Sequence, residues 1–276
     1  MNADLPTPAR GRALWDIRQV HRSWALPHPE LAFGGPEQRV LPDRYQANAL
    51  RAVERCLIVQ DGLLNAAELV DLQQAHADLQ VGVSSRFRRQ GQAAFEPLAT
   101  GGAPRASAQQ IRRIQEAKAV VINRIWHQRF AFLLAQPEQV NHIDAWINDC
   151  PLHQGQKGRY HFTHYDCDEY LEFSKGLFRF PAYAAVFYLD VDPRLDGGRL
   201  WFPELGQAVI PATNRVAIFD ARYAHSVLPA AAPSRAKRTV LTMNVWDYET
   251  RNERIELESG ALGYVENRRH ELDWLP

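Results

Sequence analysis

The segment "GRYHFTHYDCDEY" places His164 and Asp166 one residue apart, and His225 follows later in "IFDARYAHSVLP". Alternate residues of a β-strand project from the same face, so His164 and Asp166 could hold one ion together. Two imidazoles and one carboxylate can occupy one face of an iron octahedron and leave three positions open. An H-x-D pattern alone often occurs by chance, so its neighbours must supply the context. With His225 added, the spacing predicts an iron enzyme that uses O2.

The elements that would position these residues are short strands. From about residue 140, β-branched or aromatic runs alternate with Gly, Pro, Asp or Asn. They read "IDAWIND", "GRYHFTHYD", "AYAAVFYLDV", "GRLWF", "QAVI", "RVAIFD" and "RTVLTMNVW". So many short strands in about a hundred residues predict an antiparallel sandwich or jelly roll. His225 directly follows "RVAIFD", which would bring it to the same mouth of the barrel as the other two ligands.

Helices are expected before these strands. The run "CLIVQDGLL" predicts a strand, and Asn65 with Glu68 forms the capping-box pattern of a helix start. Ser107 with Gln110 repeats the pattern, and the helix they open should run to the break at Pro137. Residues 81–106 are rich in Gly, Ser and Arg and predict a long loop. Helices followed by strands predict an α+β fold whose helices buttress one sheet.

The chain divides into three parts by composition. Residues 1–50 hold six of the 17 prolines, and their tryptophans suggest an irregular arm packed on the domain. Residues 51–247 form the predicted domain, with the jelly-roll core at about 140–247. Residues 248–276 are a C-terminal extension.

Charge and cysteine content exclude several classes of protein. Lys+Arg and Asp+Glu both number 32, so no global field favours nucleic acid or an anionic membrane. No run is apolar and long enough for a membrane helix. Three cysteines do not make a disulfide framework, and reduced thiols indicate a cytoplasmic protein. The oligomeric state stays open.

Four motifs in order resemble 2-oxoglutarate and Fe(II)-dependent dioxygenases of the prolyl-hydroxylase-like group. They are "GRYHFTHYD", "VFYLDVDPRLDGGRLWFP", "RVAIFDARYAHSVLP" and "RTVLTMNVW", and "CLIVQDGLLNAAELVDL" is similar to the first strand and helix of that group. The resemblance covers roughly residues 55–247. It implies a double-stranded β-helix, a jelly-roll or cupin-like fold.

The resemblance also implies roles for individual residues. His164, Asp166 and His225 would hold Fe(II), and 2-oxoglutarate would bind the metal as cosubstrate, with ascorbate as a candidate additional cofactor. Arg238 matches the arginine that holds the distal carboxylate of oxoglutarate, which a guanidinium can grip bidentately. Tyr188 sits where relatives often place a hydroxyl on the same carboxylate.

Some positions leave alternatives open. Arg235 and Lys237 are neighbouring cations that could replace Arg238, and Tyr188 could be core packing. His161 stands where many relatives have tyrosine, and the adjacent Tyr160 could substitute for it.

The expected activity is hydroxylation of a C–H bond of a small polar metabolite, such as an amino acid or natural-product intermediate, with release of succinate and CO2. Asp166 supports hydroxylation, because related halogenases have a small residue in its place. A hydroxylase of peptidyl or protein side chains, an oxidase that lacks the oxoglutarate requirement and a non-catalytic jelly-roll binding or sensing module are the alternatives.

Two groups of polar residues are further candidates for substrate contacts. The arginines of "SSRFRRQGQ" (Arg86, Arg88 and Arg89) could close over an anionic substrate or simply face solvent. Asn148 and Asp149, near the end of a predicted strand, could bind polar substrate groups or serve a turn.

Overall fold

The computed structural model describes residues 56–79, 84–90, 94–98, 106–151, 165–168, 179–195, 197–228 and 237–250. Several predictions fall outside these ranges. They are the N-terminal arm, most of the C-terminal extension, and the residues Tyr160, His161, His164 and Arg235.

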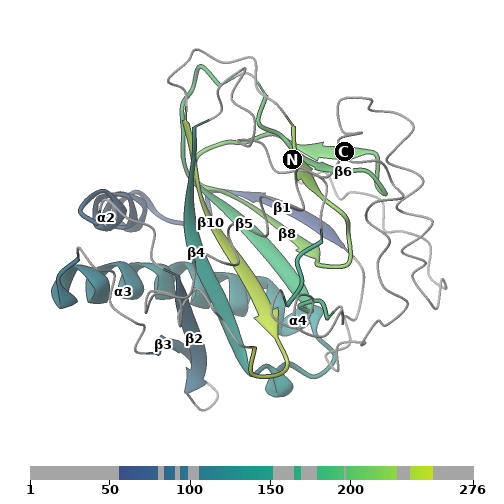
Figure 1. The fold of residues 1–276 in the computed structure, drawn as a ribbon, viewed down its shortest axis with the longest axis horizontal. Helices are drawn as coiled ribbons and strands as arrows, with labels where there is room; N and C mark the ends of the chain where they lie inside the picture. Colours follow the sequence, from purple (N-terminus) through teal and green to yellow (C-terminus); the bar gives the residue numbers. More distant parts are fainter. Residues whose placement is uncertain are drawn as a thin grey trace, which may run out of the picture.

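The described strands form two antiparallel sheets (Figure 1). The large sheet has the order β1 (Leu57–Asp61), β8 (Arg215–Asp220), β5 (Tyr183–Val191), β10 (Lys237–Trp246), β4 (His142–Pro151), β2 (Ser85–Gln90) and β3 (Ala94–Pro97). The small sheet has the order β7 (Gln207–Val209), β6 (Leu200–Phe202) and β9 (Ser226–Val227). All the described pairings are antiparallel.

Two capped helices cover one face of the large sheet. Helix α2 (Ala66–Ala77) starts at the predicted capping box of Asn65 and Glu68, and α3 (Ala108–Ile125) starts at that of Ser107 and Gln110. The chain continues through η3 (Trp126–Phe130), α4 (Ala131–Leu133) and η4 (Pro137–Gln139). In Figure 1, α2 and the beginning of α3 lie on the left of the large sheet, whereas β6 lies at the upper right.

None of the described helices combines the length and the apolar composition that crossing a bilayer would require.

Strand alternation divides the interior into two apolar cores. The first core lies between the helices and the large sheet, and β10 contributes Leu241, Met243 and Val245 to it. The second core contains residues of both sheets, among them Val186 of β5, Val240 of β10 and Phe202 of β6. Two facing sheets with helices on the outer side confirm the predicted α+β jelly-roll architecture with buttressing helices.

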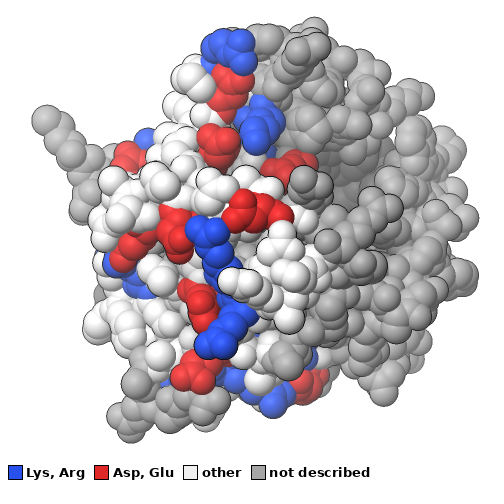
Figure 2. All heavy atoms as spheres, turned by 90° about the vertical axis from the view of Figure 1, so that its left-hand side faces the viewer, with Lys and Arg blue, Asp and Glu red and all other residues white. Residues whose placement is uncertain are grey.

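The helix-bearing face has mixed charge. Figure 2 shows red and blue side chains interspersed over this side of the molecule. Arg113 bonds both Asp71 and Asp78, at 3.1 and 2.7 Å, and Arg124 bonds Glu68 at 2.6 Å. These ion pairs connect α3 to α2 and the turn that follows it, and they leave no large patch of one sign among the described residues that face the viewer.

The prediction of a loop over residues 81–106 is wrong in part. Residues 85–90 and 94–97 form the antiparallel pair β2 and β3, and β2 also pairs with β4. Phe87 and Phe95 are buried in the first core, which gives the pair an apolar inner face. The arginines in "SRFRRQ" obscured this alternation, because Arg86 finds its partners far away in the sequence.

Candidate active site

His225 lies between β8 and β9, and its side chain is oriented by two contacts. Its Nδ1 atom lies 3.2 Å from the carbonyl oxygen of Tyr223. A carbonyl can only accept, so Nδ1 is the donor of this hydrogen bond and Nε2 is the ring nitrogen left for a metal. The ring packs edge-on against Phe219 with centroids 4.9 Å apart. Metal-binding histidines typically donate their other ring N–H to a carbonyl or carboxylate in this way, which fixes the orientation of the ring.

Asp166 meets His225 across the interior. The Oδ2 atom of Asp166 lies 3.8 Å from Nε2 of His225, and both side chains are largely buried. Two of the three predicted ligands therefore converge, although they are far apart in sequence. His164 lies outside the described residues. Within the described part of the chain no cluster of three His, Cys, Asp or Glu side chains occurs, so the triad is complete only if His164 joins it.

The segment that carries Asp166 differs from the prediction. Tyr165–Asp168 has no strand pairing, so the strand expected over "GRYHFTHYD" does not extend through Asp166. Other contacts fix the segment instead. The amide of Asp168 donates to the carbonyl of Arg179 at 2.9 Å, and the hydroxyl of Tyr248 donates to the Asp168 carboxylate. The ring of Tyr165 packs edge-on against Phe180.

Arg238 and Tyr188 form a second buried group on the same side of the large sheet. Arg238 is 2% exposed, and its guanidinium carbon lies 5.8 Å from the centroid of the Tyr188 ring. Its Nη1 donates to the Gly198 carbonyl at 3.0 Å, but its Nε has no hydrogen-bond partner. The hydroxyl of Tyr188, which is fully buried, also lacks one.

These unmet donors match a carboxylate. Burial raises the pKa of Tyr188, and the positive charges of Arg238 and Arg215 only partly oppose the rise. The hydroxyl therefore stays protonated near neutral pH and can donate. Arg238 forms no ion pair with any described carboxylate. A buried guanidinium beside a phenolic donor, both with free hydrogens, fits the distal carboxylate of 2-oxoglutarate. The nitrogen and oxygen donors of His225 and Asp166 fit Fe(II).

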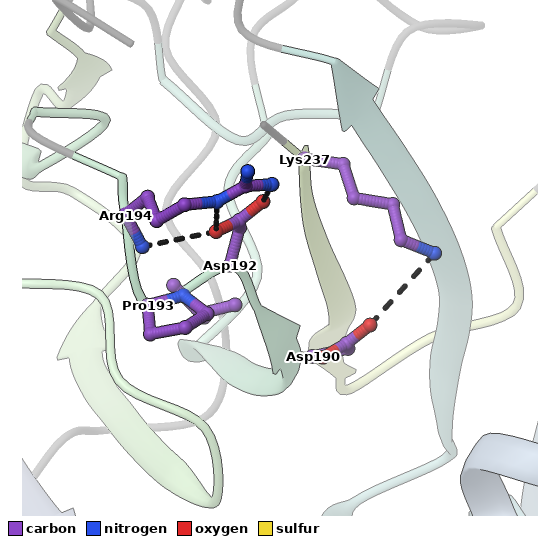
Figure 3. A pocket seen from close by; sticks show the side chains of 6 residues that line it. Asp190, Asp192, Pro193, Arg194 and Lys237 are labelled. Atoms are coloured by element: carbon purple, nitrogen blue, oxygen red, sulfur yellow. Dashed lines mark hydrogen bonds and ion pairs between the residues drawn. The ribbon is translucent and has the colours of Figure 1, made fainter. Parts of the chain in front are cut away.

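Lys237, one alternative to Arg238, lies elsewhere. It is exposed, and its Nζ is 3.7 Å from Asp190. Figure 3 shows it at the rim of an open surface pocket of about 390 Å³, where Arg194 is bound to Asp192 at 2.7 Å. The charged groups of this pocket are paired with one another, so we assign no chemistry to it. Arg235 lies outside the described residues.

The other predicted substrate contacts have structural partners. Arg86 is buried and bonds Asp144 at 3.0 Å, Glu249 at 2.8 Å and Thr250 at 2.6 Å. Arg88 also bonds Glu249. Arg89 lies 5.1 Å from the centre of the Trp126 ring on the helix side. The idea that these arginines close over an anionic substrate is therefore not supported by their contacts.

Asp149 belongs to the helix-facing side of the large sheet. It accepts from the hydroxyl of Thr239 at 2.6 Å and lies 3.0 Å from His76 of α2. The hydrogen bond with His76 lowers the pKa of Asp149 to about 2. Asn148 is partly buried and pairs with Val240 on the opposite, site-facing side.

Sequence reasoning missed Tyr248 and its partners. Arg179 lies 3.6 Å above the Tyr248 ring and bonds Asp247 at 2.8 Å. This group connects the end of β10 to the segment of Asp166. Tyr248 lies beyond the last family motif, so no pattern pointed to it.

No protein-family model matches the sequence, and no curated protein matches it either. Solved structures do. A viral collagen prolyl hydroxylase from Paramecium Bursaria Chlorella virus-1 is 16% identical, covering 70% of this chain and 96% of its own, with a TM-score of 0.41. A prolyl-4-hydroxylase from Pseudomonas putida is 16% identical, covering 70% and 93%, with a TM-score of 0.36.

A third structure is an oxidoreductase of the 2OG-Fe(II) oxygenase family from Burkholderia pseudomallei. It is 14% identical and covers 71% of this chain and 86% of its own, with a TM-score of 0.41. At such identities and TM-scores these likenesses do not by themselves establish an activity for this chain.

Proposed function

We propose that this chain is an Fe(II)- and 2-oxoglutarate-dependent dioxygenase that hydroxylates a C–H bond of a small polar metabolite. One observation carries the proposal. Arg238 and Tyr188 hold unmet donors in the interior, on the side of the large sheet that faces the small sheet and His225. Such donors are expensive to bury unless a ligand meets them, and an anionic cosubstrate would do so.

The residues divide into a metal end and a carboxylate end. His225 and Asp166, joined by His164, would hold Fe(II). Arg238 and Tyr188 would hold the distal carboxylate of oxoglutarate. When bound, the two groups supply the oxidation of the substrate by O2: one oxygen atom enters the new C–OH group, the other enters succinate, and CO2 is released.

The chain itself contributes orientation and an apolar lining. Phe202 and Phe219 lie against His225, with ring centroids 6.1 and 4.9 Å from it. Both rings are fully buried and give one side of the metal end an apolar wall, which would strengthen electrostatic interactions there. As a metal ligand, the Asp166 carboxylate would take the place that a halide needs in the related halogenases, which supports hydroxylation over halogenation.

A non-catalytic binding module is the less favoured alternative. It explains a buried metal-competent histidine and a buried guanidinium less well, because each destabilises a fold that makes no use of it.

Succinate formation from 2-oxoglutarate tests the proposal. The full chain, loaded with Fe(II) under argon and then exposed to O2, should release succinate even without substrate, and release should increase with a substrate panel. His225→Ala should abolish it. His127→Ala is the matched control, because His127 is exposed on η3, and it should leave succinate formation unchanged. Wild-type protein that forms no succinate across the panel would contradict the proposal.

A further inference from the structure

Two further unmet polar atoms lie on β10. Oδ1 of Asn244 and Nε1 of Trp246 are buried without a hydrogen-bond partner. The two side chains are 5% and 3% exposed. Buried polar atoms of a native protein almost always have a partner, so two orphans two residues apart require an explanation.

Both side chains belong to the face of the sheet that carries the candidate site. Alternate residues of a strand share a face, so Asn244 and Trp246 lie on the same side as Arg238 and Val240. Val240 packs in the core between the two sheets. The register confirms this face, because Asn244 lies beside Ala184 of β5, which is in the same core.

The neighbours of Asn244 do not satisfy it. On one side lies Ala184, which is fully buried in the second core and has no polar side chain. On the other side Asp144 is occupied: it accepts from Arg86 at 3.0 Å and from Thr250 at 3.3 Å, and His142 lies 3.4 Å away. The Asp144 carboxylate is thus already engaged, whereas the Oδ1 atom of Asn244 has no hydrogen-bond partner.

The hydrogen-bonding roles of Asn244 Oδ1 and Trp246 Nε1 restrict which ligand group could bind both of them. Indole Nε1–H can only donate, and a carboxamide oxygen can only accept. A carboxylate needs donors alone and an ammonium needs acceptors alone, whereas a secondary amide needs one of each. The two side chains are two residues apart on the same face of β10, so one ligand group could lie between them.

The pairing of the charged side chains near Asn244 favours a neutral ligand group. Arg86 is paired with Asp144 and Glu249, and Arg88 also bonds Glu249. The charged groups that lie beside this position are therefore compensated among themselves, and a charged substrate group would gain no free counter-ion from them.

We propose that Asn244 and Trp246 form a substrate subsite that binds a neutral secondary amide, with the amide N–H donated to Asn244 and its carbonyl accepting from Trp246. This inference rests on the proposed function, because it assigns the substrate class of the same site. The substrate is then an amide-bearing compound, and a free amino acid is the poorer ligand.

Calorimetric binding under argon tests the subsite. The full chain is loaded with Fe(II) and oxoglutarate, and the probes are the N-acetyl N-methylamides of the common amino acids and the same amino acids in free form. We expect at least one diamide to bind about tenfold more tightly than its free amino acid, since each hydrogen bond contributes about 1 kcal/mol.

Two variants and a control locate the effect. Trp246→Phe keeps the ring but removes the donor, and Asn244→Ala removes the acceptor. Each should weaken diamide binding about fivefold, the equivalent of one hydrogen bond, and leave oxoglutarate binding unchanged. Met243→Leu, on the helix-facing side of the same strand, should change neither. Melting temperatures check that each variant is folded. Each variant is compared with wild type separately, so a folding defect in one leaves the other as a test.

The outcomes separate this inference from the proposed function. If wild-type protein binds oxoglutarate but prefers free amino acids, or if both variants bind diamides as wild type does, the subsite assignment is wrong and ordered water satisfies these atoms. If wild-type protein does not bind oxoglutarate at all, the proposed function fails, and the subsite assignment fails with it.

Discussion

The two faces of strand β10 are built differently. On the helix-facing side, Leu241, Met243 and Val245 pack in an apolar core, and the one hydroxyl, that of Thr239, donates to Asp149. On the site-facing side, Arg238, Asn244 and Trp246 all keep buried polar atoms without partners. An unmet buried polar group costs about 1–3 kcal/mol. One face therefore stabilises the fold, and the other gives up stability for binding.

Arg238 offers the largest test of this difference. Arg238→Ala should weaken oxoglutarate binding about 100-fold, because it leaves a buried carboxylate without its cation. Calorimetry on the Fe(II)-loaded chain under argon measures the effect. Arg112→Ala removes an exposed arginine of α3 paired with Glu116 and should have no effect on this affinity. Equal oxoglutarate affinity in wild type and Arg238→Ala would show that Arg238 does not bind the cosubstrate.

Lys118 provides a test of stability on the helix-facing side of the large sheet. It is fully buried in α3, and its Nζ lies 3.4 Å from the hydroxyl of Ser85. Burial lowers its pKa from 10.5 to about 7. Burial of a charged group costs free energy that an apolar side chain of similar size does not incur. Lys118→Met should raise the free energy of unfolding by about 2 kcal/mol at pH 7 and leave succinate formation unchanged.

The lowered pKa of Lys118 makes the free energy of unfolding depend on pH in a known direction. Between about pH 7 and 10.5 the unfolded chain binds more protons at Lys118 than the folded chain does. Wild-type stability contributed by this group therefore rises with pH across that window. The advantage of Lys118→Met should be greatest at or below pH 7 and shrink toward pH 10.5. Denaturation at several pH values measures it, and an advantage that grows with pH would contradict this account.

Tyr248 gives a smaller effect on the site-facing side. Its hydroxyl donates to Asp168, two residues from the Asp166 ligand. Tyr248→Phe should weaken Fe(II) binding about tenfold, the range seen when outer-shell partners are removed, while oxoglutarate affinity at saturating metal stays near wild type. Metal titration measures the change. If stability falls and metal affinity does not, Tyr248 has only a structural role.

Local signals made much of the fold predictable. The capping boxes at Asn65 and Ser107 depend on residues three positions apart, so the sequence alone shows them. Most strand runs also appeared where expected, because alternation and turn residues are local. The two-residue strand β9 was missed because so short a segment has no pattern of its own.

Contacts distant in sequence could not be predicted in this way. The sequence predicts a loop where β2 lies, because Arg86 gains its partners only when Asp144 and Glu249 fold beside it. Of the site, the motifs identified Asp166, His225, Arg238 and Tyr188, and the structure brings them into the interior. Whether the polar atoms of Asn244 and Trp246 find hydrogen-bond partners depends on their neighbours in the fold, and a sequence motif does not show those neighbours.

The most direct test is anaerobic titration of oxoglutarate into the full chain with and without Fe(II). We expect one Fe(II) per chain and oxoglutarate binding that depends on the metal. Asp166→Ala should lose both, whereas His127→Ala, a change of an exposed residue, should keep both. Equal oxoglutarate affinity with and without Fe(II), or an Asp166→Ala variant that binds Fe(II) as tightly as wild type, would contradict the proposed function.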